Sequence, residues 1–451
     1  MKRTLLSLLV SAGFIAQAQA VDLVEVYQQA LQHDPVLQQA DAQRKVAMSG
    51  VDIRRADFLP QLTGQLGYQF NMYEQYNQTT DSVLEGNSKG WNATLSLQQQ
   101  IFNYGTWVQM DQAEKSASQA EISYGASRQD LISRVAQAYF GVLQAQDTLA
   151  FRQAEKRAIE RQLEQTKQRF AVGLTAITDV HEAQAQYDAA VANEITAQND
   201  LDNSYEGLTQ ITGVSYTDLS VLNTNKFDPS LPQGAVKDWV KRAEENNLNL
   251  QAQRVSVEIS RDDIKVAQSG HYPTVNLTGS YSMEDTTLEP DNAPDINQPT
   301  LDNASIGIGV SVPIFSGFRT SSQVEQAQSQ FLISSQELER IYRDVVRTVR
   351  NTYNNVRASQ SSVKAYEQSV ISSQSALEAT EAGFEVGTRT IVDVLNANRQ
   401  LYQAKQQLAQ ARYNFILSNL ALKQADGSLA DSDVEMINKV LMPAAQAPKP
   451  E

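Results

Sequence analysis

Residues 384–396 read Phe-Glu-Val-Gly-Thr-Arg-Thr-Ile-Val-Asp-Val-Leu-Asn, and residues 170–180 read Phe-Ala-Val-Gly-Leu-Thr-Ala-Ile-Thr-Asp-Val. The two stretches align at a constant offset of 214 residues, which places Gly173 on Gly387 and Asp179 on Asp393. Each glycine interrupts a very long helical pattern and is followed by polar and charged residues. Because glycine permits positive φ, each stretch predicts a tight turn between two helices. We expect the two turns to form the closed tip of a hollow tube.

The turns belong to a tandem duplication. Pro60 matches Pro273, and Ile101-Phe102 matches Ile314-Phe315, at an offset of 213 residues. Each half has the same predicted order: a helical segment, two strands, a very long helix, the glycine turn and another helix. The predicted divisions are a first repeat at 21–213, a linker at 214–236, a second repeat at 237–429 and a tail at 430–451.

The first 20 residues have the pattern of a secretory signal peptide. Lys2 and Arg3 precede an apolar run, and Ala18-Gln19-Ala20 has the A-x-A form of a cleavage site. The chain contains no cysteine, which excludes disulfides, cysteine-ligated zinc, thiol nucleophiles and lipidation at the new N-terminus. Removing two of the 37 basic residues leaves 35 against 52 acidic ones, a net charge of −17. Such an acidic chain is a poor nucleic-acid binder, since phosphate contacts need clustered Lys and Arg.

Four segments alternate between apolar and small polar residues. They lie at about 62–73, 91–102, 275–284 and 304–315. In the last one, Ile306, Ile308 and Val310 alternate with glycine and serine. A period of two over about ten residues is typical of a tilted strand that crosses a membrane. A half-buried sheet in a soluble sandwich is the alternative, but the long polar stretches 74–90 and 284–303 favour membrane strands with long outer loops.

The strand count predicts the assembly. Four strands per chain cannot close a barrel, and an open sheet edge cannot lie in lipid. Eight strands from two chains would fill their own interior, whereas twelve from three chains leave a channel. Beyond the signal peptide no apolar run is long enough for a transmembrane helix. The sequence therefore predicts a mixed α/β membrane protein, a trimer that shares one 12-stranded β-barrel.

Two very long helices are predicted at about 105–170 and 318–384. Each holds roughly 66 residues, or about 100 Å at 1.5 Å per residue, and contains no proline. Val349, Val356 and Val363 recur every seven residues, which predicts left-handed coiling with a neighbouring helix near the glycine turns. These helices would extend the barrel as a helical tube. The alternative, a rod-like adhesin stalk, does not explain why membrane-type strands are interleaved with the helices.

The repeat, strands, long helices and glycine turns together resemble the outer membrane factor family of export ducts. Residues 386–395 and 176–180 carry the most specific similarity. The resemblance implies a homotrimer in outer-membrane lipid, with a twelve-helix tunnel in the periplasm and no cofactor. A periplasmic adaptor and an inner-membrane pump of the RND, ABC or MFS type would recruit it. Drugs, small toxic molecules or proteins would leave through the pore.

The resemblance also implies site residues. The periplasmic gate would comprise Thr178, Asp179, Phe384 and Arg389, with Arg389 bonded to Thr178 and Asp179. Such an exposed link contributes about 1 kcal/mol or less, which suits a gate that an adaptor must open. The alternative is that Asp179 and Arg389 only cap helix ends. The adaptor-docking tips would be Val172, Gly173, Leu174, Thr175, Val386, Gly387, Thr388 and Arg389.

Two positions depart from the family pattern. Phe384 stands where the family has tyrosine, so one hydroxyl link to Asp179 cannot form. The resemblance implies that Asp393 and Asn396 lie at the pore constriction, where the family has two aspartates, so we expect weaker cation trapping. His181 could sense pH or could simply be solvated.

Catalytic and metal sites are not expected. The sequence has no HExxH motif, no phosphate-binding loop and no cysteine, and His33 and His271 suggest no metal site.

Overall fold

The computed structural model describes residues 21–77, 82–291 and 294–443. The predicted signal peptide and the end of the tail, residues 444–451, lie outside the described residues. The described chain forms two compact units. The sheet unit comprises Asp41–Ser123 and Asn249–Ile341, and the hairpin unit comprises the other described residues.

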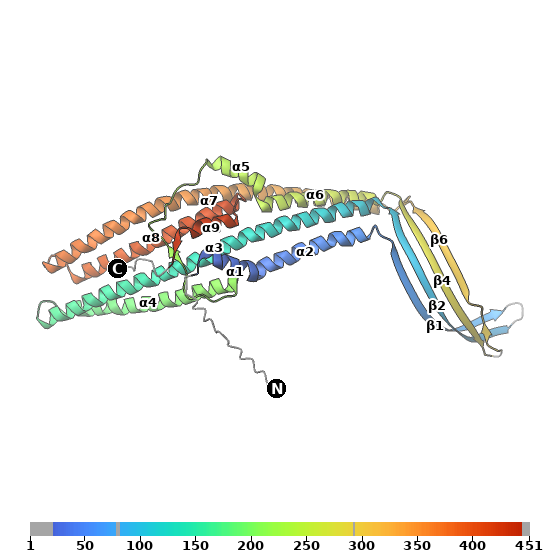
Figure 1. Ribbon diagram of the computed structural model, residues 1–451, viewed down its shortest axis with the longest axis horizontal. Coiled ribbons are helices and arrows are strands. Elements are labelled where there is room, and N and C mark those ends of the chain that lie inside the picture. The colour runs from blue at the N-terminus through green and yellow to red at the C-terminus, as the bar shows by residue number, and fades with distance from the viewer. Residues whose placement is uncertain (1–20, 78–81, 292–293, 444–451) are drawn as a thin grey trace, which may run out of the picture. The chain divides into compact units, whose positions relative to one another are not determined.

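The sheet unit contains the four predicted strands in one antiparallel sheet (Figure 1). Its order is β1-β2-β4-β6, with a two-residue strand β5 at one end of β4. Each long strand continues into a helix, as the repeat predicts. The strands are β1 (Gln61–Asn77), β2 (Ser82–Phe102), β4 (Thr274–Pro290), β5 (Ile296–Asn297) and β6 (Leu301–Ser311), and the helices are α2 (Pro35–Ala56), α3 (Tyr104–Ala171), α6 (Leu248–Ser269) and α7 (Arg319–Glu385).

Three of these strands are longer than predicted, with 17 residues in β1, 21 in β2 and 17 in β4. The predicted loops at 74–90 and 284–303 are therefore wrong in extent, because much of each is strand. The β1–β2 pairing runs on to Asn77 and Ser82, through a polar sequence. Alternation identifies only the part of a strand with an apolar face, whereas backbone hydrogen bonds continue through polar residues. Lys89 of β2 pairs with Glu289 of β4 in this extension.

The apolar face of the sheet is open to its surroundings. Leu66, Met72 and Ile306 are 81%, 82% and 78% exposed. An apolar patch of this kind marks a surface that is covered by another body or by lipid. Among the described helices, none combines the length and the hydropathy needed to cross a membrane.

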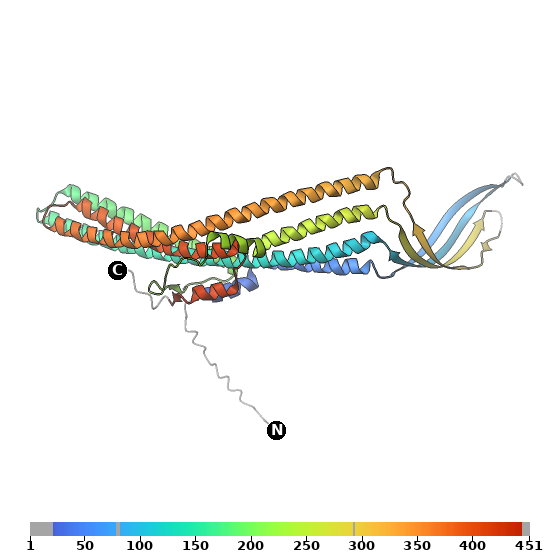
Figure 2. The ribbon, with the colours of Figure 1, turned by 90° about the horizontal axis from the view of Figure 1, so that it is seen from above.

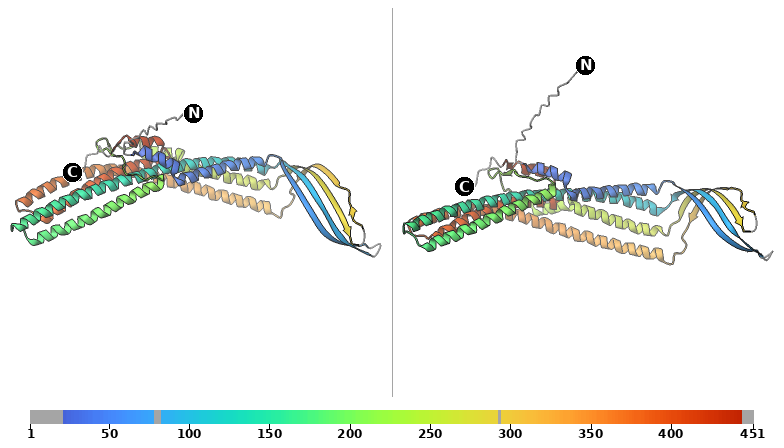
Figure 3. Two further views of the ribbon diagram at one scale, coloured as in Figure 1. Left: turned by 60° about the horizontal axis from the view of Figure 1, so that its bottom comes forward. Right: turned by 90° about the horizontal axis from the view of Figure 1, so that it is seen from below.

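The hairpin unit is built from two antiparallel helix pairs. The end of α3 lies beside α4 (Ile177–Thr212), and the end of α7 lies beside α8 (Ile391–Ala425), in every view (Figures 1 and 3). The long helices end close to their predicted limits. Val349, Val356 and Val363 are fully buried, which confirms that the seven-residue repeat marks a packing seam.

The core of the hairpin unit gathers short elements against the long helices. Figure 2 shows α1 in blue beside α9 in red. Tyr139 and Phe140 of α3 are buried in this core, and the Tyr139 hydroxyl donates to the carbonyl of Ser220 at 2.6 Å. The backbone of Val21 pairs with Leu219. The short elements of this core are α1 (Leu23–His33), β3 (Val221–Leu222), α9 (Asp431–Asn438) and β7 (Leu441–Met442). The hairpin unit also contains α5 (Val236–Asn246), whose residues are not part of this core.

Candidate functional site

The two glycine turns have the same backbone geometry. Gly173 has a φ of 77° and Gly387 a φ of 80°, values that glycine adopts without a steric penalty. Leu174 N–H donates to the carbonyl of Arg169 at 2.8 Å, and Thr388 N–H donates to that of Gly383 at 2.8 Å. These bonds satisfy carbonyls that the helix ends leave free. Each turn therefore closes its helix pair in a defined conformation.

The docking tips predicted at these turns are solvent-exposed and partly apolar. Val172, Leu174 and Val386 are 71%, 70% and 75% exposed. Among the described residues, no heavy atom outside the two chain neighbours lies within 4 Å of a Cβ position built on either turn glycine. The tips thus combine exposed apolar side chains with a glycine that has open space beside its Cα.

Asp393 is held by the start of α8. Its Oδ2 accepts from the backbone N–H and from the hydroxyl of Thr390, both at 2.9 Å, while its own N–H donates to the Thr390 hydroxyl at 3.2 Å. This reciprocal capping box orients the carboxylate. The Thr390 hydrogen bonds, with a smaller contribution from the charge of Arg389, hold the pKa of Asp393 below its usual range. Asp393 is therefore ionised at neutral pH.

The predicted gate residues lie on the two hairpins of the unit. Thr178 and Arg389 are exposed, and Asp179 is half-buried and accepts a hydrogen bond from Thr175. Within the described part of the chain, no hydrogen bond or ion pair joins Arg389 to Thr178 or Asp179. The link predicted for Arg389 therefore stays a prediction for the assembled protein. His181 is exposed at the start of α4.

Phe384 has a partner that the sequence analysis missed. The guanidinium of Arg169 lies 4.6 Å from the centroid of the Phe384 ring, within range of a cation–π interaction. The half-buried ring packs against two apolar clusters, one that includes Ile391 and Leu395 and one that includes Leu377 and Val394. Phe384 thus joins the ends of α3, α7 and α8 by apolar and cation–π contacts. No sequence signal pairs it with Arg169, because the two residues are far apart in the chain.

Asn396 also has an unpredicted partner on α8. Arg399 Nη2 donates to Asn396 Oδ1 at 2.6 Å, and both side chains are exposed. A cavity of about 330 Å³ is lined by residues from the last turns of α3 and α7 and from the start of α8. Its lining includes the charged residues Arg161, Glu381 and Glu385, together with Phe384 and Asn398.

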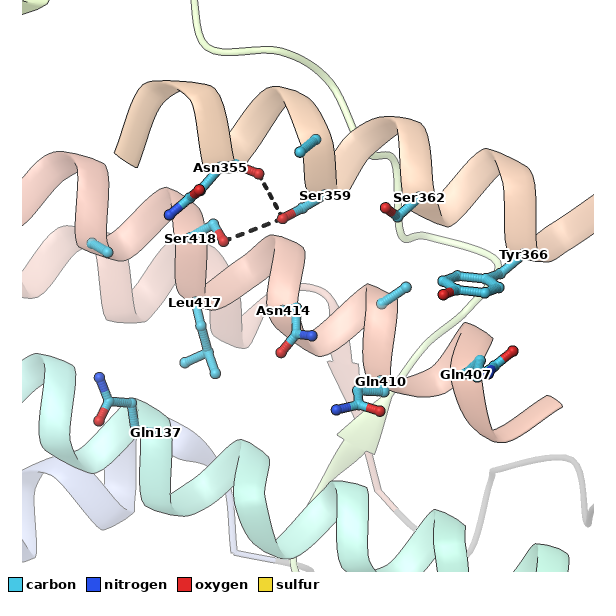
Figure 4. A pocket seen from close by; sticks show the side chains of 13 residues that line it. Gln137, Asn355, Ser359, Ser362, Tyr366, Gln407, Gln410, Asn414, Leu417 and Ser418 are labelled. Carbon is cyan, nitrogen blue, oxygen red and sulfur yellow. Dashed lines mark hydrogen bonds between the residues drawn. The ribbon is translucent and has the colours of Figure 1, made fainter. Parts of the chain in front are cut away.

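A larger cavity of about 670 Å³ lies between α3, α7 and α8 (Figure 4). Amides and hydroxyls dominate its lining. Ser359 donates to the carbonyl of Asn355 at 2.7 Å and bonds Ser418 at 3.3 Å. In the described ranges, no group of three His, Cys, Asp or Glu side chains could hold a metal ion. The cavity is a water-compatible hollow along the helices, without a pair of acid and base groups.

The chain belongs to the outer membrane efflux protein family, whose model matches residues 26–214 and 239–428. The two matched segments correspond to the two halves of the duplication. The outer membrane protein TolC of Vibrio cholerae is 45% identical over 439 residues, covering 97% of this chain and 98% of that relative. TolC of Escherichia coli strain K12 is 43% identical, covering 95% of this chain and 87% of that relative.

A solved structure shares the fold. The Campylobacter jejuni CmeC outer membrane channel superimposes with a TM-score of 0.78 at 17% identity, covering 93% of this chain and 90% of that one. These comparisons confirm the predicted family and its architecture of two repeats. They support an exit duct and lend no support to an adhesin stalk.

Proposed function

We propose that this chain is the outer-membrane exit duct of an export system that releases drugs, small toxic molecules or proteins. The observation that carries the proposal is the pair of glycine turns, which close the helix hairpins and present exposed apolar tips. Family membership supports this function. The duct has no catalytic role in the proposal, and the transported molecule passes through it unchanged.

The assembly in this proposal is a homotrimer. Among the described strands, β1 pairs only with β2 and β6 only with β4, so both edges of the sheet are open. Open edges in lipid cost several kcal/mol per unpaired backbone group. Three copies would join these edges into one 12-stranded barrel, with the apolar face that includes Leu66 and Ile306 toward outer-membrane lipid. The helices would then line a tunnel in the periplasm.

The gate in this proposal lies at the glycine turns. Arg389 would bond Thr178 and Asp179 in the closed trimer, and Phe384 would add apolar packing. A periplasmic adaptor would dock on the tips at 172–175 and 386–389 and separate the hairpins. An inner-membrane pump would supply the cargo. Asp393 and Asn396 would form the narrowest section of the pore.

Divalent cations should block this pore more strongly after the change Asn396→Asp. The change adds a second carboxylate per subunit, and affinity for a divalent cation rises with the number of carboxylates, so we expect roughly threefold tighter block. Single-channel currents in planar bilayers, recorded over a range of MgCl₂ concentrations, measure the block. Asn396→Gln is the control for side-chain volume. Equal block in the wild type and Asn396→Asp would show that position 396 does not line the constriction.

Two measurements test the proposed function. The purified mature protein should migrate as a trimer and conduct ions in planar bilayers, which an adhesin stalk would not do. A deletion strain should become sensitive to drugs, or should lose secreted proteins from the medium, and the intact gene should restore the phenotype. A protein without conductance, together with an unchanged deletion strain, would contradict an export function.

A further inference from the structure

We propose that Arg399 sets the ion selectivity of the pore constriction, because its positive charge offsets the negative charge of Asp393. The two charges on α8 would then offset each other, and the constriction would admit small anions as well as cations. The proposal rests on the proposed function, since a constriction exists only in the assembled duct.

Arg399 is held at the constriction by a neutral partner. Its Nη2 donates to Asn396 Oδ1 at 2.6 Å. Over residues 21–77, 82–291 and 294–443, no carboxylate lies within ion-pair distance of Arg399. An amide oxygen positions a guanidinium without neutralising it. The charge of Arg399 is therefore fixed one helical turn from Asn396 and acts on its surroundings.

The face of α8 that carries Arg399 is the one that does not pack within the hairpin unit. The opposite face is buried and includes Ile391, Val394, Leu395, Asn398, Leu401 and Tyr402. The exposed positions between residues 391 and 404 of α8 are Val392, Asn396, Arg399, Gln400 and Gln403. Four of these five side chains are polar, which is typical of a helix face that meets water rather than another helix.

Asp393 and Arg399 are close enough to offset each other. Arg399 follows Asp393 by six positions, or about 9 Å along the axis of α8. This is less than the screening length of about 10 Å at 0.1 M salt. Asp393 is ionised, because Thr390 stabilises its carboxylate. Each subunit thus places one negative and one positive charge on the first turns of α8, and these two charges offset each other.

The same geometry bears on the change Asn396→Asp. The new carboxylate would lie three residues before Arg399 and would pair with it. Part of the added negative charge would then be neutralised. The double change Asn396→Asp with Arg399→Gln should therefore give tighter divalent block than Asn396→Asp alone.

Reversal potentials across a KCl gradient test the proposal, with the purified mature trimer in planar bilayers. Arg399→Gln should raise the permeability ratio of K⁺ to Cl⁻ by roughly threefold or more, because three positive charges leave the narrowest section. Arg399→Lys keeps the charge and should keep the wild-type ratio. Arg412→Gln is the matched control. It removes an arginine about 20 Å further along α8, where Arg412 pairs with Glu367 at 3.3 Å, and should leave the ratio unchanged.

The outcomes separate this proposal from the proposed function. If the wild type conducts and Arg399→Gln has the same ratio of K⁺ to Cl⁻ permeability, the proposed role of Arg399 is wrong. The proposed export function is not affected by that result. If the wild type does not conduct, both are overturned. Asp393→Asn provides a second variant, since an asparagine side-chain oxygen can still accept a hydrogen bond from the backbone N–H of Thr390 in the capping box of α8. It should lower the ratio of K⁺ to Cl⁻ permeability, and an unchanged ratio would contradict the charge balance.

Discussion

Replacing Arg389 with serine should raise the closed-state conductance of the purified channel several-fold. Arg389 is exposed at the second glycine turn. No ion pair of Arg389 is found within the described chain, and we propose that its guanidinium bonds an acceptor across a helix boundary in the proposed trimer. Serine removes both the charge and the reach of that side chain. In the proposed trimer three such weak links would be lost at once, which should lower the stability of the closed state relative to the open state.

A double-mutant cycle identifies the partner of Arg389. If Asp179 accepts the link, Asp179→Asn should open the pore in part, and its effect should not add to that of Arg389→Ser. Arg347→Ser is the control, because Arg347 pairs with Asp344 within its own helix. An unchanged conductance in Arg389→Ser would show that Arg389 does not hold the gate. Fully additive effects would show that Asp179 is not its partner.

Replacing Asp34 with alanine should destabilise the folded protein by about 3 kcal/mol or more. Asp34 is only 2% exposed. Its two carboxylate oxygens accept from Arg134 at 2.9 and 2.8 Å, and Oδ2 also accepts from the N–H of Leu37 at 2.8 Å. The change leaves the guanidinium without its buried partner and removes the cap at the start of α2. Urea unfolding followed by circular dichroism measures the loss.

Asp130→Ala is the matched control for Asp34→Ala. Asp130 bonds the same arginine at 2.7 Å, but its side chain is 50% exposed. Exposed pairs contribute about 1 kcal/mol or less, so this change should have a small effect. Similar losses for both variants would contradict a special role for the buried carboxylate.

The stability that Asp34 provides should depend on pH. The hydrogen bonds from Arg134, the largest stabilising contribution, hold the pKa of Asp34 below its usual value of 3.8. The folded state therefore binds a proton less readily than the unfolded state. The contribution is fully present above pH 3.8 and is lost as the pH falls toward the folded pKa. Asp34→Asn should flatten the acid side of the stability curve.

The long helices could be predicted well from the sequence, while the strands could be predicted only in part. A seven-residue repeat runs along a helix, and a glycine marks where it stops. The helix ends near Phe170 and Phe384 could therefore be predicted from the sequence. Strand alternation instead records where one face is apolar. It therefore missed the polar extensions in which Lys89 pairs with Glu289. The backbone pairings of β3 with β7 and of Val21 with Leu219 could not be predicted, because strands of one or two residues are too short to show an alternating pattern.

The candidate site could be located from the sequence but its contacts could not. The matching turns placed Asp393 and Arg389 near one tip, and the resemblance supplied their roles. The cation–π contact between Arg169 and Phe384 depends on how α3 and α7 pack, which the sequence does not specify. The bond from Arg399 to Asn396 is local, and the spacing of three residues on a helix could have suggested it.

The short strand β3 has a consequence for the timing of folding. Val21 bonds the backbone at Asp218 and Ser220, while Leu441 and Met442 pair with Val221 and Leu222. One segment near the middle of the chain is thus the meeting point of residues from both ends. Contacts of such high sequence separation form slowly. This part of the core must remain incomplete until residues 441–442 have been synthesised and exported to the periplasm, and until then its apolar side chains need protection from aggregation.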